Sequence, residues 1–323
     1  MDFEPMSQRT HSSPSGPHEG PPSEHPMTRI FLGPNGLRVG WRLVIAVSVW
    51  FVLAGTMPVL FLWIPGIRAA LRQLSPSGRI VLTPTVVLFS EGTLAAAALL
   101  TALLMTRVEN RSFAQYGLPG RAAFGKRFWQ GAAFGFAMIS VLMGLIAVFH
   151  GYSISGMDLR ESAALRYGLL YFAGFITVAL FEEFAFRGYL QSTLQLTTGF
   201  WPAALVLAAI FGAIHLTNPG EGVYGVVMAA CFGLLAAFTL WRTGDIWFAI
   251  GLHAAWDWGE TYFYSVRDSG VPASGHLLRS AFRGPNWLTG GSIGPEGSAL
   301  VFALLVLAAL AMFVLLPRRK QPS

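Results

Sequence analysis

The chain has 323 residues, of which 54% are hydrophobic and only 12% are charged. That charged share is about half the value for an average soluble protein. A soluble domain of this size could not bury so much apolar surface, so the composition indicates a membrane protein. The formal net charge of +6 does not indicate nucleic-acid binding, because the cations flank apolar runs and do not gather on one amphipathic helix.

Composition also divides the chain into a tail, a membrane domain and a short basic end. Residues 1–38 are rich in Pro, Ser, Gly and His and predict a disordered N-terminal tail without a cleavable signal peptide. Residues 39–317 predict a multi-pass transmembrane domain, and residues 318–323 form a basic C-terminal tail. The single cysteine, Cys231, excludes an intrachain disulfide and stands in an apolar run, where it packs as a small hydrophobe.

Apolar stretches long enough to cross a bilayer recur throughout the membrane domain. We therefore expect an all-α membrane fold with about eight transmembrane helices around an intramembrane polar cavity. Several stretches are short or interrupted, so seven spans is the alternative count. The expected spans are residues 43–63, 80–105, 128–149, 167–190, 200–216, 223–240, 246–264 and 298–316.

The distribution of basic residues predicts the orientation of the chain. Lys and Arg are frequent in residues 107–127, between the second and third spans, and in residues 318–320 after the last span. With an even number of spans, these regions and both termini lie in the cytoplasm of a bacterial cell. Arg68, Arg72 and Arg79 then fall on the outer side, against the rule. Residues 157–166 mix polar and apolar side chains and are expected at a membrane interface.

The fourth span carries ionisable residues, which are costly within a membrane and therefore indicate function. Glu183 and Arg187 are four residues apart, so they share a helix face and can form an ion pair. Glu182 points about 100° away around the helix and is free to face another neighbour. An unpaired intramembrane carboxylate of this kind suits a general base.

Two later spans add further ionisable residues. His215 ends the fifth span, and His253 and Asp257 lie four residues apart on one face of the seventh. Together with Glu182, these side chains can meet in one cavity and activate water, either directly or through a metal ion. His215 falls late in its span, and a broken or tilted helix would bring it to the depth of the others.

These residues form three motifs in a fixed order. The chain resembles the CPBP family of intramembrane proteases, also called Abi proteins, which includes the type II CAAX-prenyl endopeptidases and bacteriocin-processing enzymes. The resemblance covers about residues 163–264. It is carried by Glu182-Glu183-x-x-x-Arg187, Phe211-x-x-x-His215 and His253-x-x-x-Asp257.

The resemblance implies an endopeptidase that hydrolyses a peptide bond of a membrane-associated, in some members prenylated, substrate. It implies that Glu182 and His215 activate the attacking water. His253 and Asp257 would bind a metal or stabilise the oxyanion, and Glu183 with Arg187 would support the site. The partners expected from this reading are the lipid bilayer and a peptide or protein substrate, with no nucleic acid.

Asp257 stands where many relatives have Asn. An amide can donate a hydrogen bond to an oxyanion, whereas an ionised carboxylate cannot. Asp257 therefore favours one divalent metal, with zinc as the first choice and Glu182, His215, His253 and Asp257 as the candidate ligands. The alternative is a protonated Asp257 in a site without metal.

Two other functions remain open at this point. A proton- or ion-coupled transporter also uses Glu and His within membrane spans, but it commonly shows internal repeats, and we find none. A catalytically silent membrane scaffold would not need Glu182, His215 and His253. For two further acids the sequence gives less: Glu91 either lines the same cavity or faces lipid headgroups, and Glu260 is expected to be solvated at the end of its span.

Overall fold

The computed structural model describes residues 30–34, 36–61, 63, 82–218 and 220–316. The greater part of the expected N-terminal tail and the expected basic C-terminal tail lie outside these residues. The chain divides into two units at Arg38. The first contains two short antiparallel strands, β1 (Leu32–Gly33) and β2 (Gly36–Leu37), and everything below concerns the second.

Helices dominate the second unit, which confirms the all-α membrane fold. Six helices in the described residues are long and apolar enough to cross a membrane. One of them is continuous from Glu161 to Thr198 and is built from three labelled parts. The six are α2 (Val39–Phe61), α4 (Pro84–Glu109), α5 (Lys126–Val148), the run α6 (Glu161–Glu183), η3 (Phe184–Leu190) and α7 (Gln191–Thr198), then α8 (Phe200–Ile214) with its turn η4 (His215–Thr217), and α9 (Val223–Thr243).

The last two expected spans are shorter than predicted, so the count of eight is not confirmed. The first is α10 (Trp247–Trp258), followed by the π-helical turn η5 (Gly259–Phe263), and the second is α12 (Leu300–Leu315). A helix of 16 residues such as α12 is about 24 Å long, against roughly 30 Å of bilayer hydrocarbon. Apolar composition predicted where these helices lie, and both end within one residue of the expected ends when η5 is counted with α10.

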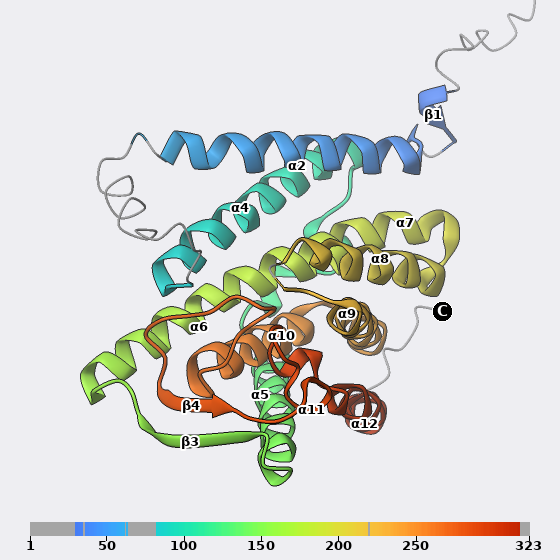
Figure 1. Cartoon of the computed structure of the whole chain (residues 1–323). Coiled ribbons are helices and arrows are strands. Elements are labelled where there is room, and N and C mark those ends of the chain that lie inside the picture. Colours follow the sequence, from blue (N-terminus) through green and yellow to red (C-terminus); the bar gives the residue numbers. More distant parts are fainter. Residues whose placement is uncertain (1–29, 35, 62, 64–81, 219, 317–323) are drawn as a thin grey trace, which may run out of the picture. The chain divides into compact units, whose positions relative to one another are not determined.

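Helix α10 is the centre of the bundle and lies between α5, α6 and α9 (Figure 1). Its closest neighbour is α5, and glycines make this approach possible. A Cβ added to Gly131 or Gly135 of α5 would collide with the backbone carbonyl of Phe248 or Leu252 in α10. Every residue of α10 from Trp247 to Asp257 is buried.

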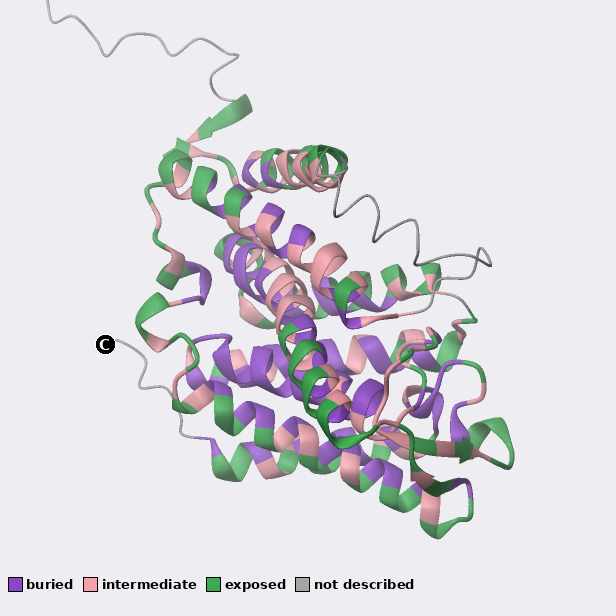
Figure 2. Cartoon of the chain, turned by 90° about the vertical axis from the view of Figure 1, so that its left-hand side faces the viewer, coloured by how far each residue is buried: buried purple, intermediate pink, exposed green. Residues whose placement is uncertain are grey.

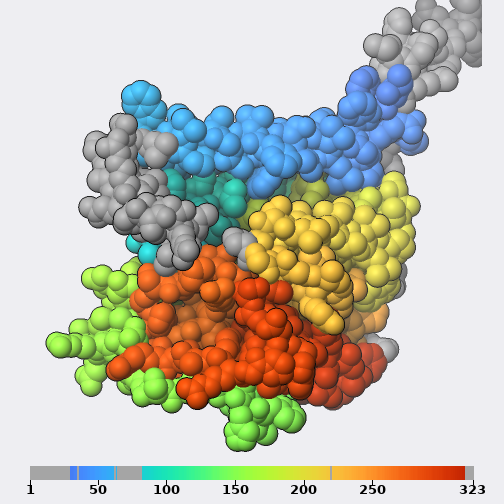
Figure 3. Space-filling view, in the orientation of Figure 1, coloured from blue at the N-terminus to red at the C-terminus, as the bar shows by residue number. Residues whose placement is uncertain are grey.

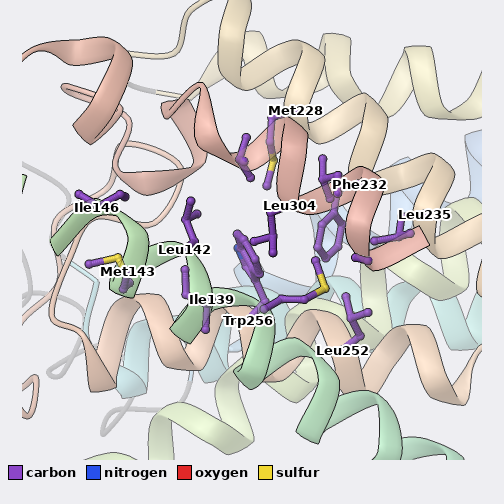
Figure 4. Close-up of a cluster of buried hydrophobic side chains, with 14 of the residues drawn as sticks. Ile139, Leu142, Met143, Ile146, Met228, Phe232, Leu235, Leu252, Trp256 and Leu304 are labelled. Atoms are coloured by element: carbon purple, nitrogen blue, oxygen red, sulfur yellow. The ribbon is translucent and has the colours of Figure 1, made fainter. Parts of the chain in front are cut away.

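Buried side chains fill the interior of the unit, and exposed apolar ones cover its outward helix faces (Figure 2). One hydrophobic cluster joins α5, α9, α10 and α12 and includes Leu142, Phe232, Trp256 and Leu304 (Figure 4). The outward apolar faces are those that lipid would cover, since water would penalise them.

A small antiparallel sheet joins two segments that are far apart in sequence. Strand β3 (Tyr152–Met157) pairs with β4 (Leu278–Phe282), with a bulge near Gly156. The sequence analysis did not predict this sheet, because each strand is short and its partner lies more than a hundred residues away. Residues 157–166, expected at an interface, contain the end of β3 and the start of α6. Short helices complete the fold: η1 (Phe113–Tyr116), η2 (Gly120–Ala122), α11 (Asn286–Thr289) and η6 (Pro295–Gly297).

Candidate active site

The first motif lies where α6 changes into a π-helical turn. Glu182 and Glu183 are the last residues of α6, and η3 (Phe184–Leu190) follows directly. Single π turns inside α-helices occur frequently at functional sites, because they change the direction of side chains on the following turn. The continuous helix of 38 residues is about 57 Å long, so its middle, where these acids lie, is far from either end.

Glu183 joins two of the motifs. Its Oε1 atom lies 3.4 Å from Nη1 of Arg187, which confirms the predicted pairing, and 2.9 Å from Nδ1 of His253. A carboxylate only accepts hydrogen bonds, so His253 donates through Nδ1. The side chain of Glu183 is fully buried. It therefore fixes the ring of His253 as well as balancing Arg187, and only the second role was predicted.

Arg187 is held by three separate elements. Besides pairing with Glu183, it donates from Nε to the carbonyl of Gly233 in α9 and lies 4.3 Å above the ring of Phe211 in α8. A Cβ at Gly233 would collide with the guanidinium group, so the glycine leaves room for it. These contacts connect α6, α8 and α9 behind the candidate site.

The second nitrogen of His253 faces two carboxylates. Its Nε2 atom lies 3.7 Å from Oε2 of Glu182 and 3.5 Å from Oδ2 of Asp257. Glu182 and Glu183 therefore contact the same ring at its two different nitrogens, so the separate neighbour expected for Glu182 is not found, although Glu182 does not join the Glu183–Arg187 pair. Because Nδ1 is committed to Glu183, Nε2 is the nitrogen available for chemistry.

His215 reaches the same cavity from α8. The helix ends at Ile214 after 15 residues, and His215 begins the turn η4. Its Nδ1 atom donates a hydrogen bond of 2.8 Å to the carbonyl oxygen of Phe211. The other ring nitrogen, Nε2, takes no part in that bond. The early end of α8 explains how a histidine late in its apolar stretch reaches the same cavity as Glu182, which lies at the end of α6 and near the middle of the continuous helix Glu161–Thr198.

All four predicted residues line one cavity of about 180 Å³. A water molecule takes about 30 Å³ in the liquid, so the space holds several waters or part of a peptide. No lysine or arginine among the described residues lines it, and its walls are strongly acidic. The ionisable side chains of the lining are Glu91, Glu182, His215, Glu221, His253, Asp257, Asp268 and Glu296.

Two acids outside the motifs, Glu91 and Glu260, can now be placed. Glu91 of α4 lines the cavity, which decides between the two places left open for it. Glu260 is fully buried, so its predicted solvation is wrong. The reason is the π turn η5, which continues the helix beyond Trp258 and keeps Glu260 inside the protein.

Among the acids of the cavity that lie outside the membrane-spanning helices, two have an environment that disfavours ionisation. Burial, followed by the nearby charge of Glu296, raises the pKa of Asp268 to about 8. Burial also raises the pKa of Glu221 above its ordinary value. Both shifts follow from taking a carboxylate out of water beside other negative charges.

The predicted zinc ligands do not converge in this arrangement. Both carboxylates approach His253, but no three of Glu182, His215, His253 and Asp257 bring their ligand atoms within 4.8 Å of one another. A tetrahedral zinc site needs such convergence, with ligand bonds of about 2.0–2.2 Å. As they lie, these residues do not fit a closed zinc site, and zinc stays a prediction to be tested.

Residues 164–259 match the family model described as type II CAAX prenyl endopeptidase, Rce1-like. No curated protein matches the chain. The matched segment contains all three motifs and begins within one residue of the region, residues 163–264, on which the resemblance rests. The match confirms the resemblance to the CPBP family of intramembrane proteases that the motifs predicted, and residues 164–259 are the part of the chain that is similar to type II CAAX prenyl endopeptidases.

Proposed function

We propose that this protein is an intramembrane endopeptidase in which Glu182 activates water for attack on a peptide bond. The observation that carries the proposal is the placement of Glu182 and Asp257 on either side of the free nitrogen of His253. Glu183 holds the ring of His253 in place through Nδ1. The side chains of Glu182, His253 and Asp257 line the cavity.

The charges of the site assign the roles of its residues. Three carboxylates, those of Glu182, Glu183 and Asp257, lie within 3.7 Å of the His253 ring. We take His253 as an imidazolium, because it and Arg187 then balance two of the three negative charges. The third negative charge, on Glu182, remains unbalanced, and Glu182 is therefore the general base. An imidazolium donates through Nε2, which makes that atom the donor for an oxyanion in the cavity.

The reaction follows from these roles. Glu182 takes a proton from water while the water oxygen attacks the peptide carbonyl carbon, and His215 Nε2 hydrogen-bonds to the same water. The carbonyl oxygen becomes an oxyanion that accepts a hydrogen bond from His253. The carbon–nitrogen bond then breaks, and Glu182 passes its proton to the departing amine. Asp257 cannot donate while it is ionised, so its role is to orient His253.

No step here is routed through a metal, because the ligand atoms of the four residues do not converge. When zinc is bound at such residues it polarises a carbonyl and activates water. Metal dependence is tested by measuring turnover with and without a chelator, alongside the metal content of the purified protein.

The substrate class is tested with peptides presented to the purified protein in lipid nanodiscs. A library would include a farnesylated peptide ending in a CAAX sequence and the same peptide without the lipid. We expect cleavage by the wild type and none by Glu182→Ala. Glu161→Gln is the matched control, because Glu161 is an exposed carboxylate at the start of the same helix. A folded wild-type protein that cleaves no member of the library contradicts the proposal. Cleavage of only the farnesylated peptide assigns CAAX specificity.

A further inference from the structure

A second group of carboxylates lies beside the candidate active site. Glu260 comes from the π turn η5, Asp268 from the loop that precedes β4, and Glu296 from the turn η6. One ligand oxygen of each lies within 4.8 Å of those of the other two. In the described part of the chain, no other three His, Cys, Asp or Glu side chains bring their ligand atoms this close together. The segment that follows α10, coloured orange to red, is on the face shown in Figure 3, and its turn η6 contacts α9.

Glu260 is the member that demands an explanation. Its side chain is completely buried, and neither carboxylate oxygen has a hydrogen-bond partner in the described part of the chain. A buried polar group without partners costs about 1–3 kcal/mol, and a charged one costs more. Such a group facing two other carboxylates needs a positive ligand or a proton between them.

Asp268 and Glu296 are, in contrast, already held in position. Thr261 donates 3.2 Å to Oδ2 of Asp268. Glu296 accepts from Nε1 of Trp256 at 3.3 Å and from the hydroxyl of Ser269 at 2.8 Å. Donors of this kind orient carboxylates around a metal ion, since they fix the side chains and leave lone pairs for the ion.

No basic side chain of the described residues forms an ion pair with the group. None of the ion pairs formed within the described residues involves Glu260, Asp268 or Glu296. Pairs elsewhere in the same structure do form, for example between Arg42 and Glu109. A proton or a bound cation must therefore offset the negative charge of the cluster.

We propose that Glu260, Asp268 and Glu296 bind one calcium ion at the edge of the active-site cavity. Three carboxylates with no histidine or cysteine select a hard, oxygen-preferring cation over zinc. Calcium–oxygen bonds are about 2.3–2.6 Å, so oxygens on opposite sides of one ion are roughly 4.6–5.2 Å apart, which matches the span of the cluster. Magnesium keeps most of its waters and binds through one or two carboxylates, so it suits this set less well.

Calcium at this place would tie three segments together next to the reacting groups. Asp268 and Glu296 line the cavity that also contains Glu182 and His253. Trp256, which donates to Glu296, is one residue from Asp257. The ion would fix the wall of the cavity without touching the substrate, and this role does not depend on the proposed hydrolysis.

The test is equilibrium dialysis of the purified full-length protein in detergent against radioactive calcium, with thermal melting as a second readout. We expect one calcium per chain, a rise in melting temperature on adding calcium, and an affinity at least tenfold weaker in Glu260→Gln. Glu221→Gln and Glu182→Gln are the matched controls, because both acids line the cavity but lie outside the cluster. Both should bind calcium as the wild type does.

Asp268→Asn and Glu296→Gln, at less buried positions, should also weaken binding at least tenfold, and they carry the test if Glu260→Gln does not fold. Absence of calcium binding in the wild type overturns the proposal and assigns a proton to the cluster. Tighter binding of zinc than of calcium, or loss of binding in Glu182→Gln in place of the cluster variants, overturns it as well. Since binding is measured without substrate, its failure is distinct from a failure to hydrolyse peptides.

Discussion

The two acidic groups beside the cavity solve the same electrostatic problem in different ways. In the first, Glu183 is fully buried but lies against Arg187 and His253, so its charge has partners within the protein. In the second, Glu260 is equally buried and has no partner in the described residues. The comparison shows that burial alone does not make a carboxylate functional. What matters is whether the fold supplies the counter-charge or leaves it to a ligand.

The difference also separates residues that react from residues that support. Glu182 is the member of the first group that is partly exposed to the cavity, with 22% of its side chain accessible. Its neighbour Glu183 has none. These adjacent residues on one helix thus have different roles: Glu182 faces the cavity, and Glu183 holds His253 in position.

The largest expected effect is on turnover when the base is removed. Glu182→Gln keeps the shape of the side chain but cannot take a proton from water, so we expect a loss of at least about 10²–10⁴-fold. The variant should insert and melt like the wild type, because Glu182 is not part of the Glu183–Arg187 pair. Peptide hydrolysis and thermal melting of the purified protein measure both. Wild-type turnover in this variant would remove Glu182 from the role of base.

The next effect is on stability when the internal counter-charge is removed. Arg187→Ala leaves Glu183 buried beside only His253, and breaking a buried pair costs roughly 3–5 kcal/mol. Arg279→Ala is the matched control, since Arg279 faces Asp158 with 65% of its side chain exposed, and exposed pairs contribute about 0–1 kcal/mol. Unfolding in denaturant compares the two. Unchanged stability with lost turnover would place Arg187 in the reaction itself.

A smaller and more discriminating effect is expected at Asp257. In the mechanism proposed here, Asp257→Asn keeps an oxygen that can accept from His253 and orient it, removes a negative charge near the oxyanion and adds a donor, so turnover should equal or exceed that of the wild type. Oxyanion donors contribute roughly 2.7–4 kcal/mol in other enzymes, which bounds the gain. If zinc is required, the same change replaces a carboxylate ligand with a weaker amide. Turnover and metal content falling together, with sensitivity to a chelator, would establish the metal mechanism instead.

Much of the fold could be predicted from the sequence, because each membrane span is a continuous run of apolar residues. The pairing of Glu183 with Arg187 and the separate direction of Glu182 followed from helical spacing alone. The contact between Glu183 and His253 did not, since it joins residues seventy positions apart. Spacing within a helix predicts which side chains share a face but not which helix that face meets.

The failures have a common cause in backbone irregularity. Glu260 was expected in solvent because regular helix geometry ends the seventh span near it, whereas the π turn η5 keeps it inside. The group with Asp268 and Glu296 was missed because its members come from two separate turns and a loop with no shared spacing. A short sequence signal was present: an acid at the third position after Asp257 continues the stripe of His253.

The smallest expected effect concerns Glu260 in the absence of divalent cations. Three carboxylates this close do not all stay ionised, so the cation-free cluster holds at least one proton. Gln has the shape of a protonated glutamic acid, and Glu260→Gln should therefore change the free energy of unfolding by no more than about 0.5 kcal/mol, as ordinary tolerated substitutions do. This is the opposite of Arg187→Ala, although both side chains are buried. Adding calcium should then stabilise the wild type and leave the variant unchanged, which denaturant unfolding with and without calcium measures. A loss above about 1 kcal/mol in cation-free buffer would show that Glu260 has a counter-charge within the protein, and the contrast between the two acidic groups would fail.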